Sequence, residues 1–276
     1  MNAPYDLHTH SNYSDGTDTP ERIVRAAGEK NVWLVALTDH DTIEGVPETA
    51  QAGGQAGVAV LPGIEINTQS PFELHILGLG VDIHNGALQS ALKRMARTRQ
   101  ARSEAMLNKL KELGVDAAGR MPLCRGNVGR LHIALALVDG GYAKDVREAF
   151  TAFLDKGRPA YIKSDRLLPE ESIALIHAAG GIAVLAHPCH IRDNPHKVVR
   201  GLYEAGLDGI EAYYPTSTVG QRELFLSLAA QYGLFVTCGS DYHGLNRPGI
   251  EIGCAWEDTA VLRETAEYLQ KRTYKV

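Results

Sequence analysis

The stretch Trp33-Leu34-Val35-Ala36-Leu37-Thr38-Asp39-His40 places a strongly apolar run directly before a group of polar residues. Such a short apolar run is typical of a strand that is buried on both faces, as in a parallel sheet. Similar runs recur along the chain and alternate with segments of helical periodicity, one of which is expected to begin at Pro20 with Thr19 as its N-cap. The ranges expected to form strands are 5–10, 33–37, 58–66, 74–79, 181–186, 208–212 and 234–239. This alternation predicts a parallel α/β fold.

Residues 83–159 differ from the rest of the chain in composition and in hydrophobic periodicity. They are rich in Leu, Ala, Arg and Lys at helical spacing and show no clear strand pattern. A chain of 276 residues is long enough for one barrel with an insertion. We therefore expect a barrel formed by residues 1–82 and 160–276 and a helical insertion formed by residues 83–159.

The composition narrows the classes of function. A net charge of −5 argues against a general nucleic-acid-binding protein, which normally carries a basic excess, although a small anionic ligand stays compatible with it. The four cysteines are scattered without a C-x-x-C pair, which argues against a disulfide scaffold or a zinc ribbon. Residues 1–10 show no signal-peptide pattern, and no apolar run approaches the roughly 18 residues of a membrane span. We expect a cytoplasmic protein with no membrane association and no stable protein partner.

Polar residues end or follow several of the expected strands, as His40, His187 and Asp241 show. In (β/α) barrels the carboxyl ends of the strands form the rim that carries the chemistry. One or two such residues would be explained as caps of turns, and capping the next helix is the role that we expect for Asp41. The same placement on five or six strands instead predicts a functional site.

His8 and His10 are two residues apart in an expected strand, so both side chains leave the same face. Two imidazoles on one face are a natural pair of metal ligands, although the pair alone is explained equally well by a structural role. Asp15 adds a carboxylate in the turn that follows. Asp241 and His243 repeat the two-residue spacing after the last expected strand.

Glu65 lies between two isoleucines, where an unpaired charge costs several kcal/mol unless a partner or a cation compensates it. His75 also lies in an apolar run, and a hydrogen-bonded core histidine is the more usual explanation for such a residue. Together these positions offer too many ligands for one mononuclear site. The six histidines and three carboxylates are His8, His10, His40, His75, His187, His243, Asp15, Glu65 and Asp241.

The order and context of these residues resemble those of the polymerase and histidinol phosphatase (PHP) family over about residues 1–80 and 160–276. The motifs that carry the resemblance are His8-x-His10, Asp15-Gly16, Thr38-Asp39-His40, Gly63-Ile64-Glu65, His75, His187-Pro188 and Asp241-x-His243. The resemblance implies a distorted (β/α)7 barrel of the TIM type that holds two or three divalent metal ions.

The resemblance also implies a ligand set for each ion. One ion would be held by His8, His10, Glu65 and Asp241; a second by Glu65, His75 and His187, with Glu65 bridging; and a third by Asp15, His40 and His243. Asp15 stands where some relatives have a histidine. Imidazole and carboxylate ligands without thiolate suit Mn, Fe or Zn, and we expect Mn. The residues also expected to act in catalysis are Asp15, His40, Asp241 and His243.

Clustered divalent cations polarise a phosphoryl group and lower the pKa of a bound water, and the resulting hydroxide can attack phosphorus while the metals neutralise charge on the oxygens. Amide hydrolysis follows the same logic in related barrels. The choice of substrate must therefore depend on residues outside the metal cluster.

The insertion contains arginines in register with an apolar stripe. The stripe has a period near 3.6 and consists of Leu88, Leu92, Met95, Met106, Leu110 and Leu113. Arg99 and Arg102 continue the same face, so they either pair with protein carboxylates or meet an anionic ligand, and we favour the ligand.

A second basic segment precedes the expected helix 133–138. Asn127 is expected to cap this helix, and a helix start with Arg130 and His132 beside it is suited to binding an anion. A solvated, capped loop explains the segment equally well. This segment and the arginine-rich helix resemble one PHP subgroup, whose members act on nucleoside 3′,5′-bisphosphates or trim RNA from a 5′-phosphorylated end.

Two anion sites fit a nucleotide with two phosphates, so we expect a phosphatase that removes the 3′-phosphate of nucleoside 3′,5′-bisphosphates and leaves nucleoside 5′-monophosphates. The residues expected to bind substrate, chiefly at the other phosphate, are Arg99, Arg102, Asn127, Arg130 and His132. Tyr213 or Tyr214 would stack on the base or only pack at the rim. A metal-bound water or His190 would protonate the leaving oxygen. The alternatives are 5′-to-3′ exoribonuclease action on short RNA, histidinol-phosphate phosphatase activity, and a non-catalytic metal-binding module.

Overall fold

The computed structural model describes residues 4–274, so the first three and last two residues of the expected barrel lie outside the described part of the chain. Seven strands form one sheet whose strands are adjacent in chain order. They are β1 (Tyr5–Thr9), β2 (Leu34–Leu37), β3 (Ala59–Asn67), β4 (His75–Leu79), β5 (Ile182–Leu185), β6 (Gly209–Tyr213) and β7 (Phe235–Cys238). Each of them lies within or overlaps a range that the apolar pattern predicts.

The sheet is not entirely parallel, which corrects the expectation from sequence. β4 runs antiparallel to both β3 and β5, whereas the other neighbouring strands are parallel. The connection of residues 68–74 between β3 and β4 is too short for the crossover that parallel neighbours need, so the two strands form a hairpin.

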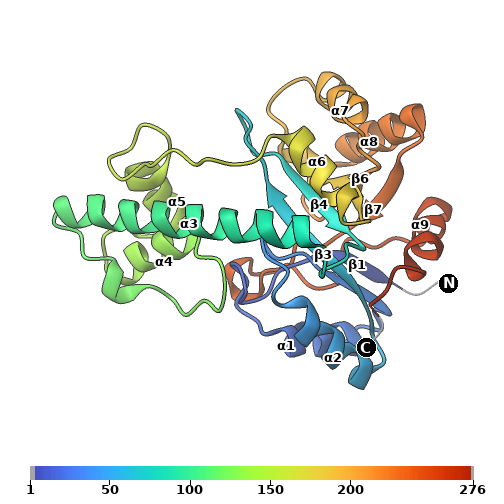
Figure 1. Cartoon of the computed structure of the whole chain (residues 1–276), viewed down its shortest axis with the longest axis horizontal. Helices are drawn as coiled ribbons and strands as arrows, with labels where there is room; N and C mark the ends of the chain where they lie inside the picture. The colour runs from blue at the N-terminus through green and yellow to red at the C-terminus, as the bar shows by residue number, and fades with distance from the viewer. Residues whose placement is uncertain (1–3, 275–276) are drawn as a thin grey trace.

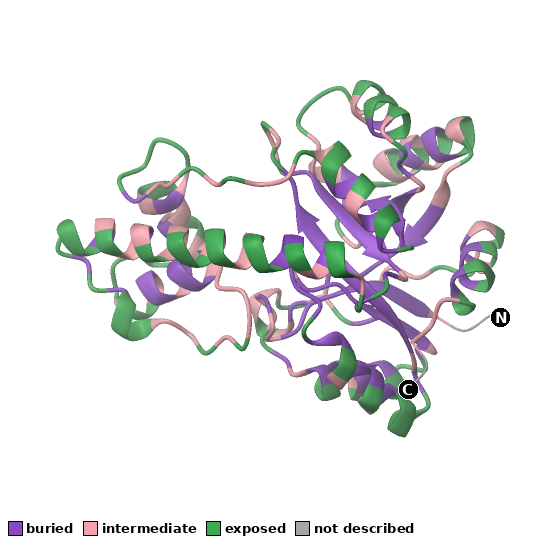
Figure 2. Cartoon of the chain, viewed as in Figure 1, coloured by how far each residue is buried: buried purple, intermediate pink, exposed green. Residues whose placement is uncertain are grey.

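The two edges of the sheet approach each other and nearly close a barrel. Beyond the end of β7, the Asp241 N–H donates to the His8 carbonyl at 2.8 Å, and the His10 N–H donates to the Tyr242 carbonyl at 2.8 Å. The result is the expected distorted seven-stranded barrel, with its strands almost entirely buried (Figure 2).

Helices flank this barrel (Figure 1). Thr19 caps the first of them by accepting from the Arg22 N–H, as the Thr-Pro pattern predicts. The helices around the sheet are α1 (Pro20–Glu29), α2 (Val46–Ala56), α6 (Pro169–Ala178), α7 (Pro195–Glu204), α8 (Val219–Tyr232) and α9 (Ala260–Gln270), with short 3₁₀ turns η3 (Pro188–His190) and η4 (Gly244–Asn246).

The segment between β4 and α6 is helical and extends away from the sheet (Figure 1). It contains α3 (Gly86–Glu112), η1 (Ala118–Arg120), α4 (Arg130–Asp139), α5 (Val146–Ala149) and the π-helical turn η2 (Phe150–Leu154). Its outer part has a hydrophobic cluster of its own, separate from the barrel core. The exact division at residues 83 and 159 stays a prediction.

The long helix α3 takes part in both clusters. Leu88 and Leu92 pack in the barrel core, whereas Met106 and Leu110 pack in the outer cluster. Leu113 does not belong to the stripe as expected: it is the C-cap, with 52% of its surface exposed, because the helix ends one residue earlier. No helix within residues 4–274 combines the length and the apolar character needed to cross a membrane.

Candidate metal centre

All nine predicted ligands lie together at one end of the barrel, which is the placement that the sequence predicts. Their positions along the strands differ from the expectation in one respect. His75 is the first residue of β4, not a residue at its carboxyl end. Because β4 is antiparallel to its neighbours, its start lies at the same rim as the ends of the parallel strands.

The first group joins β1, β3 and the segment after β7. The Nε2 atoms of His8 and His10 lie 3.3 and 3.2 Å from Glu65 Oε2. The same two atoms lie 3.4 and 3.2 Å from Asp241 Oδ1. Two imidazole nitrogens and two carboxylate oxygens therefore face one common point.

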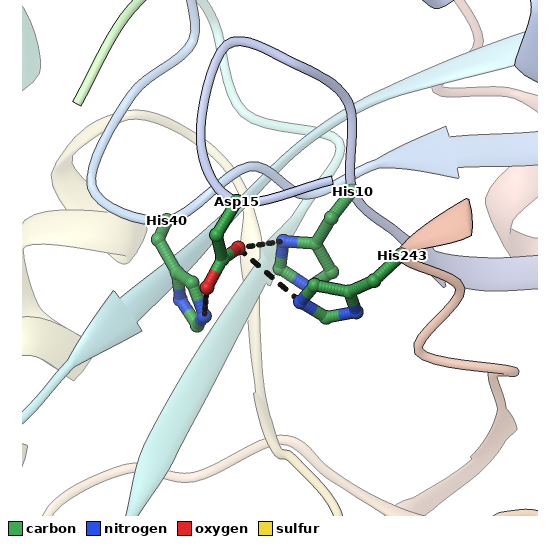
Figure 3. A group of neighbouring side chains, drawn as sticks. All are labelled: His10, Asp15, His40 and His243. Atoms are coloured by element: carbon green, nitrogen blue, oxygen red, sulfur yellow. Dashed lines mark ion pairs between the residues drawn. The ribbon is translucent and has the colours of Figure 1, made fainter. Parts of the chain in front are cut away.

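The second group lies beside the first and contains Asp15, His40 and His243, with His10 on its edge (Figure 3). Asp15 Oδ1 lies 3.2 Å from His243 Nε2, and Asp15 Oδ2 lies 3.7 Å from His40 Nε2. Asp15 thus occupies the centre of this group, between histidines that follow β2 and β7.

The third group uses the other oxygen of Glu65. Glu65 Oε1 lies 2.8 Å from His75 Nδ1 and 2.9 Å from His187 Nε2. One carboxylate thus faces two groups of histidines, as the bridging role inferred from the family resemblance requires. Glu73, which was not among the predicted ligands, also lies within reach of His75 and His187.

Several buried polar atoms in these groups have no hydrogen-bond partner among residues 4–274. They include His8 Nε2, His10 Nε2, Asp15 Oδ1 and Glu65 Oε2. Buried polar atoms without partners are rare and costly, and these atoms point toward the shared positions. Divalent cations would satisfy all four, and the imidazole and carboxylate donors fit such ions.

The charges within the groups compensate one another. Burial disfavours the ionised Glu65 carboxyl, but the His40, His8 and His75 rings around it outweigh burial and hold its pKa well below the usual range. Burial likewise opposes the charged form of His8, yet the carboxylates of Glu211, Asp241 and Glu65 raise its pKa well above the usual value. Cations that bind here would replace protons on these rings, so binding should weaken in acid.

The groups open into a cavity of about 310 Å³. Its lining residues are Asp15, His40, Glu65, Glu73, His75, His187, His190, Tyr214, Asp241, His243 and Arg247. A small phosphorylated ligand could therefore reach the predicted metal positions from solvent.

Tyr213 and Tyr214 are only 6% and 5% exposed, which favours packing at the rim over stacking on a base. The Tyr214 hydroxyl instead donates to Asp241 Oδ2 at 2.9 Å, and Arg247 pairs with the same oxygen. These contacts leave Asp241 Oδ1 directed at His8 and His10. Arg247 has no distinguishing pattern in the sequence and was not predicted.

Asp41 does not cap the next helix, which corrects that expectation. Gly45 is the N-cap of α2, and Asp41 has a positive φ of 54° that turns its carboxylate elsewhere. That carboxylate accepts from the Asn67 N–H at 3.0 Å and from Arg99 Nε at 2.7 Å. Arg99 therefore pairs with a protein carboxylate, which is the less favoured of the two alternatives expected from the sequence, while its charge also acts on Arg102 and Arg166.

The arginines beside the metal groups form a cluster, which we call the arginine cluster: Arg99, Arg102, Arg130 and Arg166. Burial and repulsion from the neighbouring guanidinium groups lower the pKa of Arg102 and of Arg166 to about 10. Among residues 4–274, Asp41 is the one carboxylate within ion-pair distance of the cluster. Four close cations with one anionic partner favour the binding of an anion.

Arg166 lies outside the predicted insertion and was not predicted, because nothing in its local sequence sets it apart.

Asn127 is not the cap of α4, since Gly129 holds that position. Its side-chain amide instead donates to the backbone carbonyls of His40 and Asp41 at 3.1 and 2.9 Å. The ring of His132 accepts from the Gly129 N–H at 3.0 Å, and burial lowers its pKa.

A family model described as the PHP domain matches residues 6–188. The chain is 33% identical over 259 residues to a 3′,5′-nucleoside bisphosphate phosphatase of Chromobacterium violaceum, covering 91% of each protein. It is also 34% identical to the 5′-3′ exoribonuclease Rnm of Salmonella typhimurium, covering 90% of this chain and 88% of that protein.

Among solved structures, an amidohydrolase from Chromobacterium violaceum with bound sulfate and no metal superposes with a TM-score of 0.88. The two are 32% identical, and the match covers 99% of this chain and 98% of the other. These similarities confirm the expected barrel and extend over nearly the whole chain. The chain therefore belongs to the PHP domain family.

Proposed function

We propose that this protein is a metal-dependent phosphatase that hydrolyses the 3′-phosphate of nucleoside 3′,5′-bisphosphates to yield nucleoside 5′-monophosphates. The observation that carries the proposal is the position of the arginine cluster beside the metal groups: Arg99 pairs with Asp41, which directly follows the predicted metal ligand His40. A substrate with two separated phosphates would engage both sites, and the similarity to a bisphosphate phosphatase supports this reading.

In this proposal the ligand sets are those inferred from the family resemblance. One ion is held by His8, His10, Glu65 and Asp241; a second by Glu65, His75 and His187; and a third by Asp15, His40 and His243. Such ions, with Mn as our candidate, polarise a phosphoryl oxygen and lower the pKa of water. The four residues proposed to act in catalysis as well, Asp15, His40, Asp241 and His243, all line the cavity.

The remaining protein groups bind and orient the substrate. Planar guanidinium groups of the arginine cluster would hold the 5′-phosphate through paired N–H donors, with His132 at the edge of the same site. His190 lines the cavity, where contacts with Cys189 and Glu73 raise its pKa to about 10. Its ring is therefore protonated at neutral pH, and we propose it as the proton donor to the leaving 3′ oxygen.

A second candidate function is 5′-to-3′ cleavage of short, 5′-phosphorylated RNA. The observation that favours it is a second cavity of about 630 Å³, which shares Glu73 and His190 with the metal cavity and is bordered by Phe72 and Arg192. This space would accept a further nucleotide. Histidinol phosphate is disfavoured because a single phosphate would leave the arginine cluster without a ligand, and a non-catalytic role is disfavoured because all nine ligand positions are filled.

The test is hydrolysis in the presence of Mn, measured as phosphate release from adenosine 3′,5′-bisphosphate and adenosine 3′-monophosphate and as release of a nucleoside 5′-monophosphate from a 5′-phosphorylated dinucleotide. We expect fast release only when a 5′-phosphate accompanies the scissile group. Equal rates with the bisphosphate and the 3′-monophosphate would contradict the role of the arginine cluster. Elemental analysis of the purified protein identifies the ion and its stoichiometry.

A further inference from the structure

Glu211 on β6 is a completely buried carboxylate that the ligand sets leave without a role. Its Oε1 lies 3.0 Å from His8 Nδ1, and its Oε2 accepts from the His187 backbone N–H at 2.7 Å. One carboxylate therefore touches two residues that belong to different metal groups. The pattern that marked Glu65, a charge within an apolar strand, is also present around Glu211 in Gly209-Ile210-Glu211-Ala212.

The contact with His8 determines which ring nitrogen faces the metal group. A neutral imidazole has one N–H donor and one lone pair, and the hydrogen bond of one nitrogen fixes the role of the other. A carboxylate at Nδ1 selects the form that carries its proton there. The lone pair then lies on Nε2, the atom without a partner that faces Glu65 and Asp241.

The contact with His187 holds an unusual backbone. His187 has φ 27° and ψ 58°, a conformation that non-glycine residues rarely adopt and that needs support from its surroundings. The hydrogen bond from its N–H to Glu211 provides such support at the point where β5 ends. It thereby helps to place the His187 ring beside Glu65.

The packing around this pair is adapted to it. A Cβ atom on Gly239 would lie 2.2 Å from Glu211 Oε1 and 2.3 Å from His8 Cβ. No side chain other than hydrogen fits at position 239 while Glu211 and His8 keep their places.

We propose that Glu211 is a positioning residue of the metal centre: it fixes the His8 ring with Nε2 toward one ion and supports the His187 backbone for another. The inference rests on the proposed function only in that both histidines are metal ligands.

His10 has no carboxylate at Nδ1 comparable to Glu211. Its Nδ1 lies 3.4 Å from the Ser14 hydroxyl, which in turn donates to Asp39 at 2.6 Å.

The test is metal affinity without substrate, measured for Glu211→Gln by competition with a fluorescent chelator for Mn and Zn. The amide keeps the shape of the side chain but presents only one acceptor atom for two donors and carries no charge. We expect affinity to fall by about 10- to 100-fold, the usual effect of removing a partner of a metal-ligating histidine.

The matched control is Asp208→Asn. Asp208 is a carboxylate that also contacts one imidazole, His177 Nε2 at 2.7 Å, and accepts from one backbone N–H, that of Ala183 at 2.7 Å, but neither partner is a predicted metal ligand. We expect this variant to lose stability but to keep metal affinity close to the wild type. Wild-type affinity in Glu211→Gln, or equal losses in both variants, would overturn the proposal.

A measurement on the unaltered protein covers the case in which Glu211→Gln does not fold. Nitrogen NMR of the zinc-loaded protein with labelled histidine should show His8 protonated at Nδ1 and coordinated through Nε2. Coordination through Nδ1 would overturn the proposal. Both readouts are independent of catalysis, so failure to find bisphosphate hydrolysis would leave them interpretable.

Discussion

Arg99 Nε donates to Asp41 Oδ2 at 2.7 Å, and Asp41 directly follows the predicted metal ligand His40. This ion pair connects the long helix α3 with the metal centre. It engages Nε and Nη2 of the Arg99 guanidinium, whereas Nη1 lies near Gly129 at the start of α4 and has no ion-pair partner among residues 4–274. Asp41 thereby orients an arginine that we propose to bind substrate, while Asp41 itself does not line the cavity.

Asp41→Asn tests this orientation. Loss of a hydrogen bond between charged groups costs about 1.5–3 kcal/mol, so we expect KM for the bisphosphate to rise about tenfold or more. Turnover of a 3′-monophosphate should stay unchanged, because that substrate does not use Arg99. Steady-state kinetics on both substrates give the answer. Glu48→Gln is the matched control, since Glu48 pairs with Arg125 instead, and equal effects of the two substitutions would refute the orientation role.

Arg166→Met removes one cation from the arginine cluster. We expect the affinity for the bisphosphate to fall by at least tenfold, because a charged contact to phosphate is lost. Isothermal titration with the product, a nucleoside 5′-monophosphate, measures the effect. Arg200→Met, at an exposed ion pair on α7, serves as the control and should bind normally. Unchanged affinity in Arg166→Met would remove this residue from the site.

The same substitution has a second expected outcome, on stability. Folding lowers the pKa of Arg166 from 12.5 to about 10. The protonated side chain therefore lowers the free energy of unfolding at every pH below about 10. A neutral apolar side chain removes this penalty. Thermal unfolding of Arg166→Met at pH 7 without phosphate should therefore occur at or above the wild-type temperature. A marked decrease would show that Arg166 acts mainly as a structural residue.

Gly239→Ala should damage the metal centre through packing alone. The added methyl group overlaps Glu211 and the His8 side chain, and overpacking typically costs about 1–3 kcal/mol. We expect a lower melting temperature and weaker metal binding. Gly54→Ala provides the contrast, because a Cβ at that helical position meets no atom within 4 Å and should be neutral or stabilising. If Gly239→Ala kept wild-type metal affinity, the packing around His8 would have to be looser than described.

Removal of the metal should lower stability, because cations that bind only the folded state stabilise it by mass action. At a free ion concentration of about 1,000 times Kd the effect is roughly 4 kcal/mol, which corresponds to a shift of several degrees in melting temperature. Scanning calorimetry with a chelator, and again after Mn is restored, measures it. His243→Ala should reduce the shift, whereas His177→Gln, which alters a pair with Asp208 away from the centre, should not. An identical melting temperature with and without metal would argue against bound ions.

Much of the fold could be predicted because buried strands have a strong apolar signature, as in Leu34–Leu37. The direction of β4 was missed, since the apolar pattern of a strand is the same in either direction. The shortness of the connection 68–74 was the available signal. It follows that loop length, rather than strand composition, decides this part of the topology.

The predicted ligands lie together because the carboxyl ends of parallel strands share one rim of the barrel, whatever the order of the strands in the sheet. Residues whose roles depend on contacts across the molecule were harder to identify. Asp41 and Asn127 fit local rules for helix caps, but tertiary hydrogen bonds determine their positions. Glu211 has the same local signal as Glu65, a charge within an apolar strand, but its partner His8 is distant in the sequence. Arg166 has no such local signal, and its neighbours in the arginine cluster are also distant in the sequence.

The helix α3 is 27 residues long, about 40 Å at 1.5 Å per residue, and each end is anchored in a different hydrophobic cluster. Arg99 and Arg102 lie on the continuous helix between these anchors, so their positions are fixed relative to both hydrophobic clusters. On the proposed function, the helix sets the spacing at which two phosphates are accepted, whatever base the nucleotide carries. Inserting a single residue before Arg99 would turn the arginines by about 100° and disrupt that spacing without changing any metal ligand.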